Sequence, residues 1–273
     1  MNGKDLLMMI SLAILAVFIW LRDLAWVSTS DDTLPILVAL PLFVWIGVPW
    51  NFRSEYESPS LTSLVWAIVI FVAGIALNMT FLLALGWTIL LWSWLSVRIE
   101  EKRRSDLIKL LVLPLFAFPW IALDADRIGW WFRLSGAWAT AHVFSAAGFQ
   151  VEQQGTNLLI DHLPISVEVA CAGLNTLQSM LIAGTFVNYT IAGHTFYYWL
   201  NIPVLFLMSW VSNTIRIIGI SAAALAVSSE FALGPFHIWG GWAILVIMFA
   251  LCWVLFSLEV RGSNKSKMDP HAH

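Results

Sequence analysis

The sequence predicts an all-α polytopic membrane protein with about eight transmembrane helices and a small external β-element. Of its 273 residues, 60% are hydrophobic and 11% are charged, whereas a soluble domain carries about 25% charged residues. Several apolar runs approach the roughly 20 residues with which a helix crosses a bilayer. Since a backbone surrounded by lipid must satisfy its own hydrogen bonds, we expect these runs to be helical.

The apolar runs divide the chain into eight expected spans. They cover residues 6–21, 34–50, 61–77, 79–97, 107–123, 174–192, 196–227 and 238–258. The run 196–227 is too long for one simple span and contains Pro203 and Arg216. We expect a single integral-membrane domain with no second soluble domain. Its expected parts are five spans in 1–123, an external segment in 124–170, a three-span core in 171–258 and a cytoplasmic tail in 259–273.

The external segment contains an ambiguous stretch at residues 128–148. It is rich in Trp and Phe but carries Arg133, Thr140 and His142, so we interpret it as an amphipathic helix in the membrane interface. The alternative, a true span, would reverse the orientation of everything that follows. The rest of the segment alternates in polarity between turn residues, which is typical of strands. The expected strands cover residues 151–153, 157–160 and 165–169.

The distribution of positive charge predicts the orientation of the chain. The loop 98–104 is its most basic stretch, and the positive-inside rule places such a loop in the cytoplasm. With eight spans, both termini lie on the cytoplasmic side of the inner membrane, together with most of the 14 Lys and Arg residues. The segment that precedes Cys171 then faces the external, periplasmic side.

Three reactive residues are expected at this outer interface. Cys171 lies where an extended run meets a helix N-terminus, and the free N–H groups and dipole there favour a thiolate. Arg216 lies in an apolar run, where insertion costs about 2.5–3.5 kcal/mol at mid-bilayer. His237 begins the last span. Each also has an ordinary structural interpretation: a small packed thiol, an arginine that reaches the headgroups, and an interfacial histidine.

Together these side chains suit acyl transfer. A thiolate can attack a peptide carbonyl, an arginine can stabilise the oxyanion, and a histidine can move protons. Asn213 shares a helix face with Arg216 because the two are three residues apart. The remaining candidates flank the nucleophile or compete for the proton role: Glu168, Gly173, His162 and His142.

Other chemistries find no support in the sequence. Its two cysteines, Cys171 and Cys252, form no CxxC pair or zinc pattern. Cys252 is expected to pack inside a span. No Rossmann glycine pattern, P-loop, HExxH or GxSxG motif occurs. No basic patch with interleaved aromatic residues indicates nucleic acid as a partner, and no metal or cofactor is implied.

Three short motifs resemble those of the exosortase/archaeosortase family. They are Val-Ala-Cys-Ala-Gly-Leu at 169–174, Asn-Thr-Ile-Arg-Ile at 213–217, and Gly-Pro-Phe-His at 234–237 with Gly240 following. Their order, spacing and helical context are similar to the family's from about residue 124 to 258. The chain departs from the usual family pattern at Ala172 and Asn175.

The resemblance implies a polytopic cysteine transpeptidase. Such enzymes process exported, membrane-anchored proteins whose C-terminal signal has a short motif such as Pro-Glu-Pro, a transmembrane helix and a basic cluster. By this resemblance Cys171 is the nucleophile, Arg216 the cation beside the oxyanion, and His237 the acid and base. The implied partners are these substrates, the lipid bilayer and an external amine, glycan or lipid acceptor.

Two other functions stay open at this stage. In a transporter or exopolysaccharide-export component, Arg216 and His237 would line a polar path, and polar residues would be spread through the membrane depth. In a non-catalytic scaffold, the protein would only bind the sorting helix. Replacement of Cys171 would have little effect in the first case, and loss of His237 would be tolerated in the second.

Overall fold

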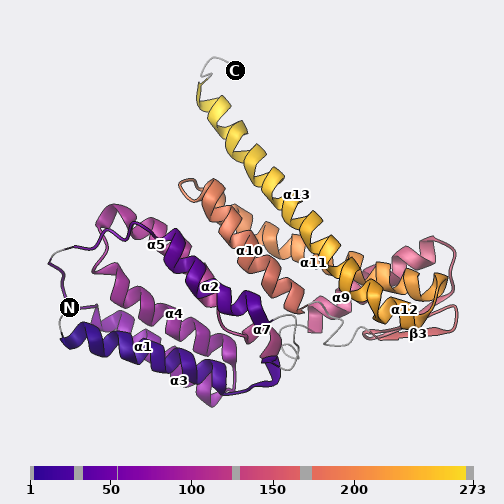
Figure 1. The fold of residues 1–273 in the computed structure, drawn as a ribbon, viewed down its shortest axis with the longest axis horizontal. Helices are drawn as coiled ribbons and strands as arrows, with labels where there is room; N and C mark the ends of the chain where they lie inside the picture. The colour runs from indigo at the N-terminus through magenta and orange to yellow at the C-terminus, as the bar shows by residue number, and fades with distance from the viewer. Residues whose placement is uncertain (1–2, 28–32, 54, 125–129, 167–173, 269–273) are drawn as a thin grey trace. The chain divides into compact units, whose positions relative to one another are not determined.

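The computed structural model describes residues 3–27, 33–53, 55–124, 130–166 and 174–268. Most of these residues are helical, and one small three-stranded sheet accompanies the helices (Figure 1). The chain forms two compact units, Met1–Asp124 and Ala125–His273.

The described residues of the N-terminal unit form four long helices and three short ones. They are α1 (Gly3–Leu21), α2 (Thr33–Ile46), α3 (Leu61–Ala76), α4 (Thr80–Ser96), α5 (Arg104–Leu110), α6 (Val112–Phe116) and α7 (Trp120–Leu123), with 3-10 turns at Ala25–Val27 and Glu101–Arg103. Helices α3 and α4 approach closely because Gly74 has no side chain: a Cβ there would lie 2.8 Å from the Leu83 backbone nitrogen. Helix α4 also packs against α1, α5, α6 and α7 and is the centre of this unit.

Polar contacts attach the end of α7 and helix α1 to α4. The Asp124 carboxylate is buried and accepts hydrogen bonds from the backbone N–H groups of Thr80 (3.0 Å) and Phe81 (2.7 Å). It therefore satisfies free donors at the first turn of α4 and complements the helix dipole. Trp87 of α4 donates through Nε1 to the Leu12 carbonyl of α1 at 2.8 Å.

The expected span at 107–123 is not one continuous helix. Two prolines explain where it breaks, because a proline ring clashes with the carbonyl four residues earlier and lacks an N–H. Pro114 lies four residues after Leu110, the last residue of α5, and Pro119 lies just after the end of α6 at Phe116.

The eight-span count as a whole is not confirmed. Among the described residues, two helical stretches are long and apolar enough to cross a membrane, Tyr197–Ala226 and Trp239–Gly262. Four shorter apolar helical stretches occur at Asp5–Leu21, Ile36–Ile46, Leu61–Ala76 and Thr80–Ser96.

The C-terminal unit combines helices with the sheet. Its elements are α9 (Trp130–Ala146), β1 (Val151–Gln154), β2 (Asn157–Ile160), β3 (Leu163–Ser166), α10 (Leu174–Ala192), α11 (Tyr197–Ala226), α12 (Ser229–Leu233) and α13 (Pro235–Met268). Helix α13 continues to Met268, through residues that the sequence assigns to a tail, and extends past the loop between α10 and α11 (Figure 1).

The sheet is an antiparallel meander in the order β1-β2-β3. Gly155 has a φ of 62° in the first turn, and Asp161 and His162 have φ values of 45° and 68° in the second. Positive φ values at such positions are typical of two-residue hairpin turns. The strands expected at 151–153 and 157–160 are confirmed. The third begins at Leu163, earlier than expected, and residues 167–169 lie outside the described part.

Helix α9 has an unusual distribution of polar side chains. Its buried face carries Arg133 and Thr140, while Trp131 and Trp138 are exposed. A surface helix in water shows the reverse arrangement, so this exposed face suits an apolar environment. The buried face packs against α11 and the sheet, and their common core contains Ala137, Ala141, Phe144, Leu158, Ile160 and Ile217.

Helix α11 is continuous over 30 residues and contains Pro203. At a rise of about 1.5 Å per residue it is roughly 45 Å long, more than the roughly 30 Å of a hydrocarbon core. Asn201 donates to Asn188 Oδ1 of α10 at 2.9 Å, and Asn188 donates to the Tyr198 carbonyl at 2.9 Å. These side chains are almost fully buried, so their hydrogen bonds fix α10 against α11.

Candidate active site

Arg216 of α11 and His237 of α13 are joined by a hydrogen bond. Arg216 Nη2 lies 2.9 Å from His237 Nε2, although the residues are 21 positions apart. Both side chains are half-buried. A guanidinium can only donate, so Nε2 accepts, and in this arrangement His237 is neutral with its proton on Nδ1. The contact combines a fixed cation and an imidazole in one place.

The turn between α11 and α13 positions His237. The Ser228 side chain accepts a hydrogen bond from the Phe231 backbone N–H at 3.1 Å and caps α12. Pro235 then starts α13, where its missing N–H has no cost. Phe236 packs against the small hydrophobic cluster of Ile220, Ala223 and Ala232. Through these contacts, the first turn of α13 lies beside Arg216 of α11.

Gly241 provides the space that the guanidinium occupies. A Cβ at Gly241 would lie 3.3 Å from Arg216 Nε and 3.4 Å from its Cζ, tighter than ordinary van der Waals contact. This residue was not among the candidates expected from the sequence. Its position four residues after His237, on the same face of α13, was the available signal.

Asn213 lies one helical turn before Arg216 and is 2% exposed. Neither its Nδ2 nor its Oδ1 has a hydrogen-bond partner among the described residues. Such an amide costs about 1–3 kcal/mol when it is left unpaired in the interior. Gly136 of α9 faces it, and a Cβ there would lie 3.9 Å from Asn213 Nδ2. A Cβ at Gly136 would thus be in van der Waals contact with the amide, so α9 lies close against Asn213 at this point.

The other candidates from the sequence are distributed differently. Glu168, Cys171 and Gly173 lie outside the described residues, between β3 and α10. His162 is exposed in the turn between β2 and β3. His142 is exposed on α9, where its Nδ1 is 2.8 Å from the Trp138 carbonyl. The structure therefore joins Arg216 to His237 and describes nothing of the expected nucleophile.

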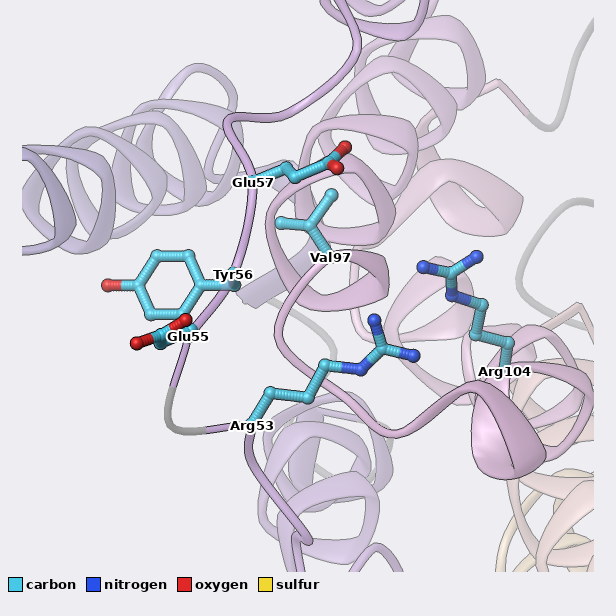
Figure 2. Close-up of a pocket in the computed structure, with 6 residues that line it drawn as sticks. All are labelled: Arg53, Glu55, Tyr56, Glu57, Val97 and Arg104. Carbon is cyan, nitrogen blue, oxygen red and sulfur yellow. The ribbon is translucent and has the colours of Figure 1, made fainter.

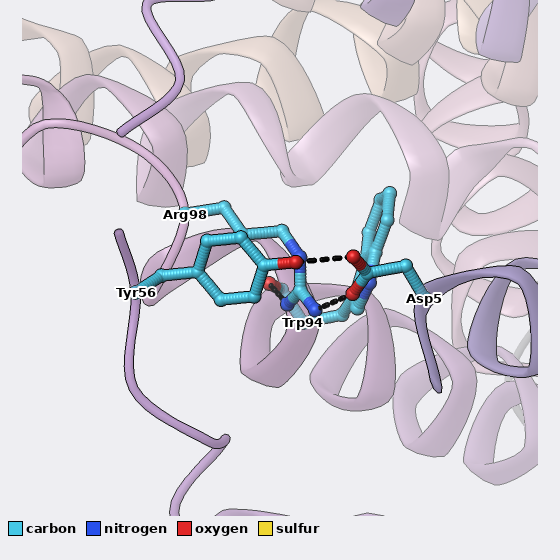
Figure 3. Close-up of polar contacts among 4 residues, drawn as sticks. All are labelled: Asp5, Tyr56, Trp94 and Arg98. Atoms are coloured by element: carbon cyan, nitrogen blue, oxygen red, sulfur yellow. Dashed lines mark hydrogen bonds and ion pairs between the residues drawn. The ribbon is translucent and has the colours of Figure 1, made fainter. Parts of the chain in front are cut away.

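A polar cluster at one end of the N-terminal unit was not expected from the sequence. Asp5 of α1 accepts hydrogen bonds from the Arg98 guanidinium and the Tyr56 hydroxyl, as Figure 3 shows. The Arg98 guanidinium also lies over the Tyr56 ring, 4.3 Å from its centroid. Asp5 and Arg98 are buried. They are 93 residues apart in the chain, which explains why no local pattern indicated this ion pair.

Next to this cluster is a cavity of about 410 Å³ with charges of both signs. Figure 2 shows the side chains that line it: Arg53, Glu55, Tyr56, Glu57, Val97 and Arg104. This lining contains no cysteine, serine or histidine and so offers no nucleophile paired with a base. No group of three or more His, Cys, Asp and Glu that could hold a metal occurs in the described part of the chain.

Comparison with protein families shows to which family the chain belongs. A family model described as transmembrane exosortase (Exosortase_EpsH) matches residues 7–254 of the 273. The chain belongs to the exosortase family. Comparison with curated proteins and with solved structures gives no match. The family match includes Cys171, Asn213, Arg216 and His237, and it identifies this exosortase as a membrane protein.

The cluster of Asp5, Tyr56 and Arg98 predicts a pH dependence of stability. The hydrogen bond to Asp5 raises the pKa of Tyr56 above its ordinary value. A group with a raised pKa in the folded state contributes its full stabilisation below its unfolded-state pKa and loses it as the pH rises through the folded-state pKa. We expect Tyr56→Phe to lower the melting temperature by a constant amount below about pH 10, and by less at higher pH.

Thermal unfolding of the wild type and Tyr56→Phe in detergent, over a series of pH values, measures this difference. Tyr197→Phe, in the other compact unit, serves as the control. A melting-temperature difference for Tyr56→Phe that persists unchanged through strongly alkaline pH would contradict this account.

Proposed function

We propose that this exosortase is a membrane-embedded cysteine protease and transpeptidase that cleaves C-terminal sorting signals of exported proteins. Its site lies at the outer face of the cytoplasmic membrane, and both termini are cytoplasmic. The observation that carries the proposal is the 2.9 Å contact between Arg216 and His237. Family membership and the match across Cys171 support it.

In the proposed first step, the Cys171 thiol loses its proton to His237. The sulfur attacks the carbonyl carbon of the scissile peptide, a C–S bond forms, and the carbonyl oxygen becomes an oxyanion. Once Nε2 of His237 is protonated it can no longer accept from Arg216, and two adjacent cations repel each other. The guanidinium is then available to stabilise the oxyanion.

Collapse of the tetrahedral intermediate completes the cleavage. The C–N bond breaks, and His237 gives its proton to the departing amine. The resulting thioester is attacked by an external amine, a glycolipid or water, whose proton passes to His237. The C–S bond breaks and the thiol is restored with that proton. No metal or cofactor takes part.

One observation favours the rival function of a transporter or export component. Buried polar side chains are distributed along the lengths of α10 and α11: Gln178, Thr185, Asn188, Asn201 and Ser209. A transporter would use polar residues spread through the membrane depth in this way. However, Asn188 and Asn201 bond to each other, as expected of residues that join helices.

Replacement of Cys171 distinguishes these functions. We expect Cys171→Ala to abolish cleavage of a reconstituted substrate that carries a Pro-Glu-Pro motif, an apolar helix and a basic tail. Arg216→Gln should lower kcat by about 10²–10³ and His237→Ala by about 10²–10⁴. Gel analysis of cleavage in proteoliposomes measures these rates, with Cys252→Ala as the active control. Cleavage by Cys171→Ala at the wild-type rate would rule out the proposed mechanism.

Gly241 provides an independent test of the Arg216 position. A valine side chain there crowds the guanidinium, and a shift of about 1 Å can cost roughly 100-fold in rate. We expect Gly241→Val to lower kcat with little change in melting temperature. Gly262→Val is the matched control on the same helix, because nothing lies within 4 Å of a Cβ at Gly262. Equal activity of the two variants would contradict the assigned position of Arg216.

A further inference from the structure

We propose that Asn213 binds the backbone of the substrate next to the scissile bond. Its carboxamide would donate to one peptide carbonyl and accept from a peptide N–H. This inference rests on the proposed function. It makes Asn213 a positioning residue, which holds the substrate while Cys171, Arg216 and His237 carry out the chemistry.

The side chain of Asn213 is buried without a hydrogen-bond partner in the described part of the chain. It is 2% exposed, and both polar atoms of its amide lack a hydrogen-bond partner among the described residues. Buried amides in native proteins are normally paired. On the same helix, Asn201 is 1% exposed and its amide donates to Asn188. The two asparagines are thus almost equally buried, but only the amide of Asn201 has a hydrogen-bond partner among the described residues.

The spacing between Asn213 and the catalytic pair suits an extended substrate. Three residues of helix advance about 4.5 Å along the axis, and an extended chain advances about 3.3–3.6 Å per residue. A peptide group held at Asn213 therefore places the next carbonyl of an extended substrate near Arg216. Gly136 of α9 lies against the amide, since a Cβ at that position would stand 3.9 Å from Asn213 Nδ2.

The Asn213 carboxamide is chemically complementary to a peptide group. A carboxamide has one acceptor oxygen and a donor nitrogen, as a peptide group does. Peptide binding can thus satisfy both Asn213 atoms at once. Backbone recognition also suits an enzyme whose substrates share a short motif but differ elsewhere, because main-chain hydrogen bonds do not depend on side chains.

Stability and activity should change in opposite directions when Asn213 is replaced by leucine. Leucine has the same number of side-chain heavy atoms and removes two unsatisfied polar atoms, so Asn213→Leu should melt at or above the wild-type temperature. Its kcat/KM should fall by about 100-fold, roughly tenfold for each lost hydrogen bond. Asn201→Leu is the matched control and should melt lower, because it leaves the buried Oδ1 of Asn188 without its donor. The full-length protein in detergent and in proteoliposomes is used throughout.

Ester substitution in the substrate locates the contact. Synthetic substrates carry a Pro-Glu-Pro motif, an apolar helix and a basic tail, and one backbone N–H at a time is replaced by an ester oxygen. We expect an ester at one position near the scissile bond to lower the kcat/KM of the wild type about tenfold. The same ester should leave the kcat/KM of Asn213→Leu unchanged.

Two results would overturn the inference. One is a melting temperature of Asn213→Leu as low as that of Asn201→Leu, which would make Asn213 a structural residue. The other is an identical response of the wild type and Asn213→Leu to every ester substitution. Failure of the proposed function is recognised separately, because Cys171→Ala would then cleave the unmodified substrate as fast as the wild type.

Discussion

A guanidinium inside an apolar helix is the constraint on which the C-terminal unit depends. Arg216 lies in α11, where its charge is costly unless polar groups surround it. The start of α13 provides these surroundings: His237 accepts a hydrogen bond from Arg216 at 2.9 Å, and Gly241 leaves room for the guanidinium. The capped turn at Ser228 and the packing of Phe236 hold that arrangement.

Buried polar residues on α11 fall into two kinds, and the difference separates structure from proposed function. Asn201 is satisfied by Asn188 and joins two helices. Asn213 is equally buried but is unsatisfied within the described residues. Evolution keeps an unsatisfied group despite its cost where function requires it. The same helix thus provides fixed helix contacts along its first half and a prepared site beside Arg216.

Local patterns predicted a good part of this molecule. Alternating polarity and turn residues gave β1 and β2 within one residue, and the depth of Arg216 in its apolar run placed it near His237. Their catalytic roles stay predictions. The break of residues 107–123 into α5, α6 and α7 follows from Pro114 and Pro119, which the apolar composition obscured. The ion pair of Asp5 with Arg98 could not be found, because long-range pairs leave no local periodicity.

We propose that Arg216 and His237 serve the thiol of Cys171 on the outer face of the membrane. The decisive measurement is labelling of intact spheroplasts with a charged, membrane-impermeant thiol reagent in a Cys252→Ala background. We expect fast labelling of Cys171 from outside at neutral pH, slowed about tenfold in His237→Ala because the thiolate fraction falls. Labelling that requires membrane disruption, or that proceeds equally fast in His237→Ala, would rule out this arrangement.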